Sequence, residues 1–199
     1  SIEEGRLRPT IVVLNNGGPV SHYNVPDRGL RGRDHFIEEL IPLIDRQYRT
    51  IASREGRALQ GYSQGGRATA RIGLGFPELF SQLVIGSAGA DPEKRIHDSG
   101  GRESETLAFE PGDDMWTYTE AYAETFRKKY PIEIFLHVGD AADYNYEGNL
   151  KYDAFLTKLG LEHEFVIVPD QKHGHKPYDR LYERITAFQE SAFVSNLDR

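Results

Sequence analysis

The pentapeptide Gly61-Tyr62-Ser63-Gln64-Gly65 is the part of this sequence whose residue types and spacing could carry out chemistry. It fits G-x-S-x-G, the pattern of a nucleophilic serine held on a sharp turn between a β-strand and an α-helix. Residues 57–60 can form a short buried strand before the turn, and residues 66–74 can form the helix after it. We expect glycine at both ends of the pattern because a Cβ there would press on the neighbouring strand or helix. Ser63 is therefore predicted to occupy a strained corner with its hydroxyl exposed.

A serine nucleophile needs a base to take up its proton, and the usual base is a histidine held by a carboxylate. In three-layer hydrolases the order along the chain is Ser, then Asp or Glu, then His, each in a loop that follows a strand. His173 and His175 follow the last predicted strand, where this order requires the base. We choose His173 because it comes sooner after the strand, and keep His175 as the alternative. The remaining histidines precede the serine, lie in or before strands, or fall in a long connection.

The loop that follows the predicted strand 132–138 carries three carboxylates that could complete the triad. We prefer Asp143, with Glu147 second and Asp140 third. Asp140 could instead brace the turn, and Glu147 could lie in the first turn of the next helix, where a negative charge is favoured. The sequence therefore supplies an acid in the right loop and leaves three candidates for it.

A tetrahedral intermediate also needs hydrogen-bond donors for its oxyanion. The backbone N–H of Gln64 is the first expected donor, because it follows the nucleophile at the start of a helix. The second normally comes from a loop after an earlier strand, and the glycine-rich stretch 15–18 is the candidate substitute. Four residues are predicted to border the substrate, in addition to Gln64: Tyr62, His22, Tyr23 and Trp116.

Short apolar runs alternate with segments of helical periodicity along the chain. The predicted strands are 10–14, 58–62, 83–86, 132–138 and 164–168, and the predicted helices are 34–48 with a kink at Pro42, 67–74, 118–129, 150–159 and 178–193. This order predicts an α/β fold of three layers, with a mostly parallel sheet between helices and ligands bound beyond the carboxyl ends of the strands. We expect one domain over residues 1–199, with a long excursion at about 87–131 that covers the sheet edge or contacts substrate.

The composition narrows the classes of protein further. Lys and Arg number 24 against 31 Asp and Glu, a net charge of −7, which argues against a nucleic-acid surface. No apolar run is long enough to span a membrane. The absence of cysteine excludes disulfides, thiolate metal sites and a cysteine nucleophile, but it is compatible with cytoplasmic and with secreted or periplasmic surroundings. His173-Gly174-His175 lacks a spaced third ligand for zinc, so we expect no metal and no cofactor.

Several stretches together resemble a known family. They are Arg8 to Leu14, Glu39 to Pro42, Arg49 to Ile51 with Gly56 to Ala58, Gly61 to Gly66, Tyr144 to Leu150, and Val168 to Asp170 with His173. The chain is thereby similar to the “putative esterase” branch of the α/β-hydrolases, which holds enterochelin, feruloyl and acetyl xylan esterases and esterase-D-like enzymes. The resemblance runs over nearly the whole chain and is specific for the family rather than for a substrate.

The resemblance implies that Ser63 is the nucleophile, that His173 is the base and that the acid lies in the 139–147 loop, with Asp143 best placed. It implies a serine carboxylic-ester hydrolase working through an acyl-enzyme on a small-molecule or carbohydrate-linked ester. The alternatives are a binding module with the same fold and an acyltransferase with the same triad. The family places strands and an oxyanion loop before the segment that begins at Arg8. We therefore expect the C-terminal portion of a longer fold or an unusual short form, with an open sheet edge that a partner chain or a homo-oligomer could cover.

Overall fold

The molecule is built around a parallel sheet of four strands in the order β3-β4-β5-β6. The computed structural model describes residues 2–17, 22–90, 112–140, 142–174 and 176–197. The strands are β3 (Ala58–Tyr62), β4 (Gln82–Gly86), β5 (Glu133–Gly139) and β6 (Glu164–Val168). Because all four run in the same direction, their carboxyl ends meet at one edge of the sheet. This confirms the predicted α/β class and the predicted strands from residue 58 onward, except that β3 is not buried as predicted, because it lies at the edge of the sheet.

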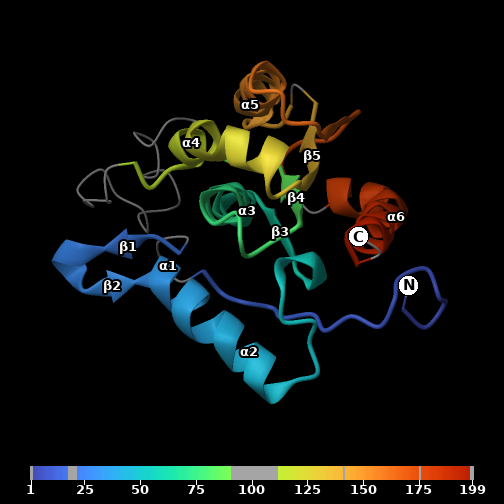
Figure 1. Ribbon diagram of the computed structural model, residues 1–199. Coiled ribbons are helices and arrows are strands. Elements are labelled where there is room, and N and C mark those ends of the chain that lie inside the picture. The colour runs from blue at the N-terminus through green and yellow to red at the C-terminus, as the bar shows by residue number, and fades with distance from the viewer. Residues whose placement is uncertain (1, 18–21, 91–111, 141, 175, 198–199) are drawn as a thin grey trace.

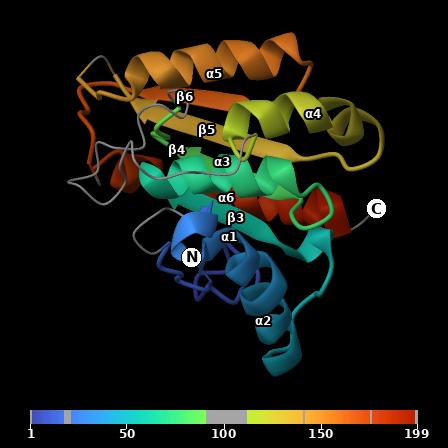
Figure 2. The same cartoon turned by 90° about the vertical axis from the view of Figure 1, so that its left-hand side faces the viewer.

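Helices cover both faces of this sheet (Figure 1, Figure 2). On one face lie α3 (Gln64–Gly75), α4 (Met115–Lys128) and α5 (Tyr146–Lys158), and on the other lies α6 (Lys176–Leu197). All four were predicted as helices, with shorter bounds. The α4 helix starts earlier than predicted because the carboxylate of Asp114 caps it, accepting hydrogen bonds from the Thr117 N–H at 2.8 Å and the Thr117 hydroxyl at 2.6 Å. Within the described ranges, no helix combines the length and apolar character that crossing a bilayer requires.

The core is divided by the sheet according to the period-2 alternation of its strands. Leu83 and Ile85 of β4 belong to the apolar cluster under α3, α4 and α5, whereas Val84 between them packs on the α6 side with Leu181 and Ile185. All five β4 residues are buried. A strand covered on both faces can hold its carboxyl-terminal loop at a fixed position, and this is the property a catalytic loop needs.

The region before β3 contains short elements. They are β1 (Asn24–Val25), the 3₁₀ turn η2 (Pro26–Arg28), β2 (Leu30–Arg31), α1 (Gly32–Asp34), the π-helical turn η3 (His35–Leu40), α2 (Ile41–Gln47) and the 3₁₀ turn η4 (Arg54–Gly56). The predicted helix 34–48 thus exists, and its irregularity falls next to Pro42. Proline has no N–H for the helical hydrogen bond. Pro42 is the second residue of α2, and the widened π turn ends directly before that helix, at Leu40.

The prediction of a buried strand at residues 10–14 was wrong. The segment has no strand conformation, and Val12 and Leu14 are 69% and 93% exposed. Arg8 anchors it to α6 through Glu190, whose carboxylate accepts from the Arg8 backbone N–H at 2.9 Å and from its guanidinium at 3.0 Å. A cleft of about 470 Å³ is lined by this segment, including Thr10 and Ile11, and by β3. Among the described residues, β3 pairs with β4 alone, so the 10–14 segment does not join the sheet and β3 is an edge strand.

Candidate active site

Ser63 occupies the sharp turn between β3 and α3 that the sequence predicts. Its backbone has φ 57° and ψ −117°, a conformation that L-residues other than glycine adopt only under constraint. The Ser63 N–H donates to the Gly86 carbonyl at 2.8 Å, and the Ser63 carbonyl accepts from the Arg67 N–H at 3.0 Å. The neighbouring strand and the first turn of α3 therefore both hold the serine in this strained conformation.

The glycines of the turn differ from the expectation in one respect. A Cβ on Gly61 would lie 2.2 Å from the Gly65 carbonyl oxygen, as the pattern implies, but a Cβ on Gly65 would meet no atom within 4 Å. Gly66 is the second glycine that close packing requires, because a Cβ there would lie 2.5 Å from the Gly86 carbonyl oxygen. Gly65 instead borders the open cleft beside β3. The second position that requires glycine is thus residue 66, one residue later than predicted.

Two alanine substitutions should separate these glycines. We expect Gly66→Ala to lower the free energy of unfolding by about 1–3 kcal/mol, since the methyl group would push α3 away from the backbone of β4. Gly65→Ala should be neutral or stabilising by up to about 1 kcal/mol, because alanine favours the helix and the space is open. Urea denaturation of the two variants beside the wild type measures both effects. Equal destabilisation by both substitutions would contradict this account of the turn.

Three loops bring Ser63, His173 and Asp143 into one chain of hydrogen bonds. The Ser63 Oγ lies 2.8 Å from the His173 Nε2, and the His173 Nδ1 lies 3.0 Å from the Asp143 Oδ1. The three residues follow β3, β6 and β5, so the parallel sheet delivers them to its carboxyl edge. The acid and base loops are themselves in contact, since a Cβ on Gly139 would lie 2.2 Å from the Gln171 carbonyl oxygen. This is the geometry of a nucleophile, a base and an orienting acid.

The Asp143 carboxylate is buried, with 2% of the residue exposed. Burial by itself raises its pKa, but hydrogen bonds from His173, the Asn145 backbone N–H and the Ser87 hydroxyl outweigh it and hold the pKa below the ordinary value for aspartate. Asp143 is therefore ionised near neutral pH. An ionised carboxylate can only accept hydrogen bonds, so the proton between it and His173 lies on Nδ1, and Nε2 presents its lone pair to Ser63.

The two other candidate acids lie elsewhere in the same loop region. Asp140 accepts from the Ala142 N–H at 3.2 Å and from the Asp170 N–H at 2.6 Å, so it braces the acid loop against the base loop. Glu147 stands in the first turn of α5. Asp140 thus braces a turn and Glu147 lies at the start of a helix, as the sequence analysis considered for them. Asp143 is the one of the three that contacts His173. His175, the alternative base, lies outside the described residues.

Aromatic rings flank the imidazole of His173. The Tyr62 ring centroid lies 5.1 Å from it, and the Tyr62 hydroxyl accepts from the Gly174 N–H at 3.0 Å. Tyr144, which the sequence analysis did not single out, lies 4.2 Å away by ring centroids and is 75% exposed. Its position beside Asp143 in the sequence was the available signal. Tyr62 therefore supports the base loop, and Tyr144 borders the base on the solvent side.

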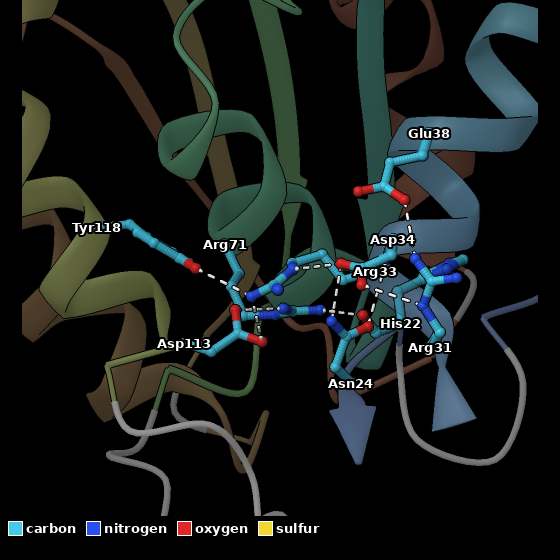
Figure 3. A network of polar contacts seen from close by, with 9 residues as sticks. All are labelled: His22, Asn24, Arg31, Arg33, Asp34, Glu38, Arg71, Asp113 and Tyr118. Atoms are coloured by element: carbon cyan, nitrogen blue, oxygen red, sulfur yellow. Dashed lines mark hydrogen bonds and ion pairs between the residues drawn. The ribbon is translucent and has the colours of Figure 1, made fainter. Parts of the chain in front are cut away.

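His22 lies in a polar network around Arg71 of α3 (Figure 3), and its neighbour Tyr23 packs against the same arginine. Buried Arg71 donates to the His22 carbonyl oxygen at 2.7 Å, contacts Asp113 at 2.7 Å and lies 3.8 Å above the Tyr23 ring. Tyr23 is 2% exposed, so it packs in the core rather than bordering a substrate. The His22 ring packs edge-on to Phe36 and lines the cleft beside β3. None of these contacts involves Ser63 or His173.

Trp116 also has a packing role. Its indole N–H donates to the Ala90 carbonyl oxygen at 3.0 Å, and its ring contacts Tyr152 and Phe155 of α5 at centroid distances of 5.1 and 5.0 Å. The residue therefore joins α4 to α5 and supports the segment that follows β4. Its place in the pocket wall stays a prediction, because the sequence shows aromatic character but not the direction of the side chain.

The structure describes some of the residues that are expected to donate hydrogen bonds to the oxyanion. Gln64 is the first residue of α3, so its backbone N–H lies at the N-terminus of that helix. Asn15 lines the cleft beside β3, and Gly18 of the same glycine-rich stretch lies outside the described residues. Within the described part of the chain no group of three His, Asp or Glu side chains could hold a metal ion.

His137, one of the histidines that lie in a predicted strand, is fully buried in β5 next to the site. Its ring lies 6.1 Å from those of Tyr62 and Phe135, and burial lowers its pKa to about 4. Between pH 6.5 and 4 the unfolded chain thus binds a proton that the folded protein excludes, so stability falls as pH falls through this window. This group should lower the free energy of unfolding by about 3 kcal/mol toward pH 4.

His137→Gln should remove that share of the pH dependence. Urea denaturation at pH 7 and pH 4.5 should give a smaller difference for this variant than for the wild type. His35→Gln is the control, because His35 is an exposed side chain paired with Glu39 on the helix surface. An unchanged pH dependence in His137→Gln would show that the buried ring does not contribute.

The fold is that of an α/β-hydrolase, with Ser63 on the sharp turn between β3 and α3. A sequence model of the family described as “Putative esterase” matches residues 1–158, and the chain belongs to this family. An endo-1,4-beta-xylanase/feruloyl esterase of Xylanibacter ruminicola is 34% identical over 101 residues, which is 49% of this chain and 14% of that protein. The chain therefore corresponds to a small part of this curated relative.

Solved structures show the same fold. A ferulic acid esterase superposes with a TM-score of 0.77 at 20% identity, over 96% of this chain and 74% of that one. Staphylococcus aureus fluorophosphonate-binding serine hydrolase F superposes with a TM-score of 0.71 at 17% identity, over 88% of this chain and 68% of that one. At these identities the likeness concerns the fold.

Proposed function

We propose that the protein hydrolyses carboxylic esters through a Ser63–His173–Asp143 triad and an acyl-enzyme intermediate. The observation that carries the proposal is the continuous chain of hydrogen bonds from the Ser63 Oγ through both imidazole nitrogens to a buried carboxylate. Membership of the esterase family supports the same reaction class.

In the first step the Ser63 Oγ attacks the ester carbonyl carbon and its proton passes to the His173 Nε2. Asp143 remains ionised and stabilises the imidazolium through the Nδ1–H. Collapse of the tetrahedral intermediate transfers that proton to the leaving alcohol and leaves the acyl group on Ser63. Water then attacks the acyl-enzyme with His173 again as the base, and the acid product is released. The backbone N–H of Gln64 is the proposed donor to the oxyanion in both steps.

The proposed substrates are small-molecule or carbohydrate-linked esters of phenolic or acetic type. Tyr144 offers an exposed ring beside His173, a surface suited to an aromatic acyl group. The name of the Xylanibacter relative includes feruloyl esterase, which is consistent with this class. An acyltransferase would use the same triad with an alcohol in place of water. The chain of hydrogen bonds from Ser63 to Asp143 is equally consistent with that reaction.

A binding module without turnover is the second candidate function. The candidate loop for the second oxyanion donor, residues 15–18, is only partly described, and losing such a donor would cost about 10²–10³ in turnover. Fluorophosphonate labelling together with p-nitrophenyl acetate hydrolysis separates the candidates. Labelling located at Ser63 with measurable hydrolysis supports the esterase, and the absence of both would overturn it. Product analysis with an added alcohol distinguishes acyl transfer.

A further inference from the structure

Ser87 lies between the acid and the base of the triad. It follows β4 directly, is fully buried and has φ 39°, a left-handed conformation for a residue that carries a Cβ. Its backbone is held on both sides: the N–H donates to the His137 carbonyl at 2.6 Å, and the carbonyl accepts from the Asn145 side-chain amide at 2.7 Å. A strained conformation maintained in this way within a site points to a function for the side chain that it aims.

The Ser87 Oγ contacts both partners of the His–Asp pair. It lies 2.7 Å from the Asp143 Oδ2 and 2.9 Å from the His173 Nδ1. Because ionised Asp143 can only accept, the hydroxyl proton of Ser87 is donated to Oδ2. The Ser87 oxygen, which also interacts with the Tyr62 hydroxyl, can then accept from the His173 Nδ1–H, which also points to the Asp143 Oδ1 at 3.0 Å. The Nδ1–H is thus shared between two acceptors.

We propose that Ser87 is a positioning residue of the catalytic machinery, acting through Asp143 and His173. This inference rests on the proposed ester hydrolysis. The hydroxyl fixes the rotation of the carboxylate, since Oδ2 is held by Ser87 while Oδ1 accepts from His173 and from the Asn145 N–H at 2.9 Å. It also gives the imidazolium a second acceptor once His173 has taken the proton of Ser63. Ser87 keeps its own proton throughout, so no additional proton transfer is required.

Two substitutions at one position separate this role from a merely structural one. Ser87→Ala removes the hydroxyl and keeps the strained Cβ, whereas Ser87→Gly removes the hydroxyl and relieves the strain. Neither removes the backbone hydrogen bonds of the residue. If the hydroxyl positions the triad, both variants should lose activity alike, although their stabilities should differ, with the glycine variant the more stable of the two. The glycine variant also keeps the test open if the alanine variant folds poorly.

The expected result is a fall in kcat of about 10- to 100-fold in both variants with KM nearly unchanged, the scale of one hydrogen bond to a charged group. The rate of fluorophosphonate labelling should fall in parallel, and the downfield proton NMR signal of the His173 Nδ1–H should shift. Ser81→Ala is the matched control, because Ser81 is equally buried just before β4 and its hydroxyl contacts only the Glu55 carbonyl, at 3.4 Å.

The outcomes distinguish this inference from the proposed function. If the wild type is active and both Ser87 variants keep kcat within about twofold of it, the proposed role of Ser87 is overturned and the triad is left intact. A loss of activity that follows the unfolding free energy, large in Ser87→Ala and absent in Ser87→Gly, would also overturn it. Wild-type protein that neither hydrolyses esters nor reacts with the fluorophosphonate would instead contradict the triad itself.

Discussion

Ser63→Ala is expected to reduce the hydrolysis of p-nitrophenyl acetate by roughly 10⁴- to 10⁶-fold, the scale seen when a serine hydrolase loses its nucleophile. The reason is geometric. The Ser63 Oγ is the atom that lies 2.8 Å from the His173 Nε2, and alanine leaves the base with no proton to take up. Covalent labelling by a fluorophosphonate should disappear in the same variant.

Ser191→Ala is the matched control for this substitution, since Ser191 lies on the exposed side of α6, away from the triad. It should retain wild-type turnover and labelling. Alanine at position 63 must adopt the same positive φ as the serine, so folding has to be checked. Circular dichroism should show that both variants are folded. Wild-type turnover in Ser63→Ala would rule out the acyl-enzyme mechanism.

Asp143→Asn is expected to lower kcat by about 10⁴-fold, because an asparagine amide can hold His173 in the wrong tautomer. The carboxylate now keeps the proton on Nδ1 and the lone pair of Nε2 toward Ser63. An amide N–H placed at the same position would donate to Nδ1 and move the ring proton to Nε2. The hydroxyl of Ser63 would then face a donor instead of a base.

Asp140→Asn and Glu147→Gln provide the comparison, as both remove a carboxylate from the same loop region. Neither residue contacts His173 in the structure, so each variant should keep activity within a few-fold of the wild type. Asp140→Asn should act mainly through the brace between the acid and base loops, by weakening the hydrogen bond from the Asp170 N–H. A larger kcat loss in Glu147→Gln than in Asp143→Asn would assign the acid to Glu147.

The sequence predicted the elements around the site well where local pattern and burial agree. The predicted strand 83–86 is apolar and lies in β4, whose five residues are all buried, so the pattern and the packing favour the same conformation. The segment 10–14 has an equally strong β pattern, yet it lies exposed beside an open cleft. A strand needs a neighbouring strand for its hydrogen bonds, and the local sequence does not record whether that neighbour is present.

By itself, the sequence determined the nucleophile turn, the order of the three loops and the candidates for the acid, because these depend on residue type and on position after a strand. Only the tertiary structure showed that Asp143, among three carboxylates, contacts His173, separated Gly65 from Gly66, and gave the packing partners of Trp116, His22 and Tyr23. It also brought in Ser87, 24 residues after the nucleophile and 56 before the acid. Hydrogen bonds form over about 3 Å, and which side chains come that close is decided by the register of parallel strands and the direction in which each side chain packs.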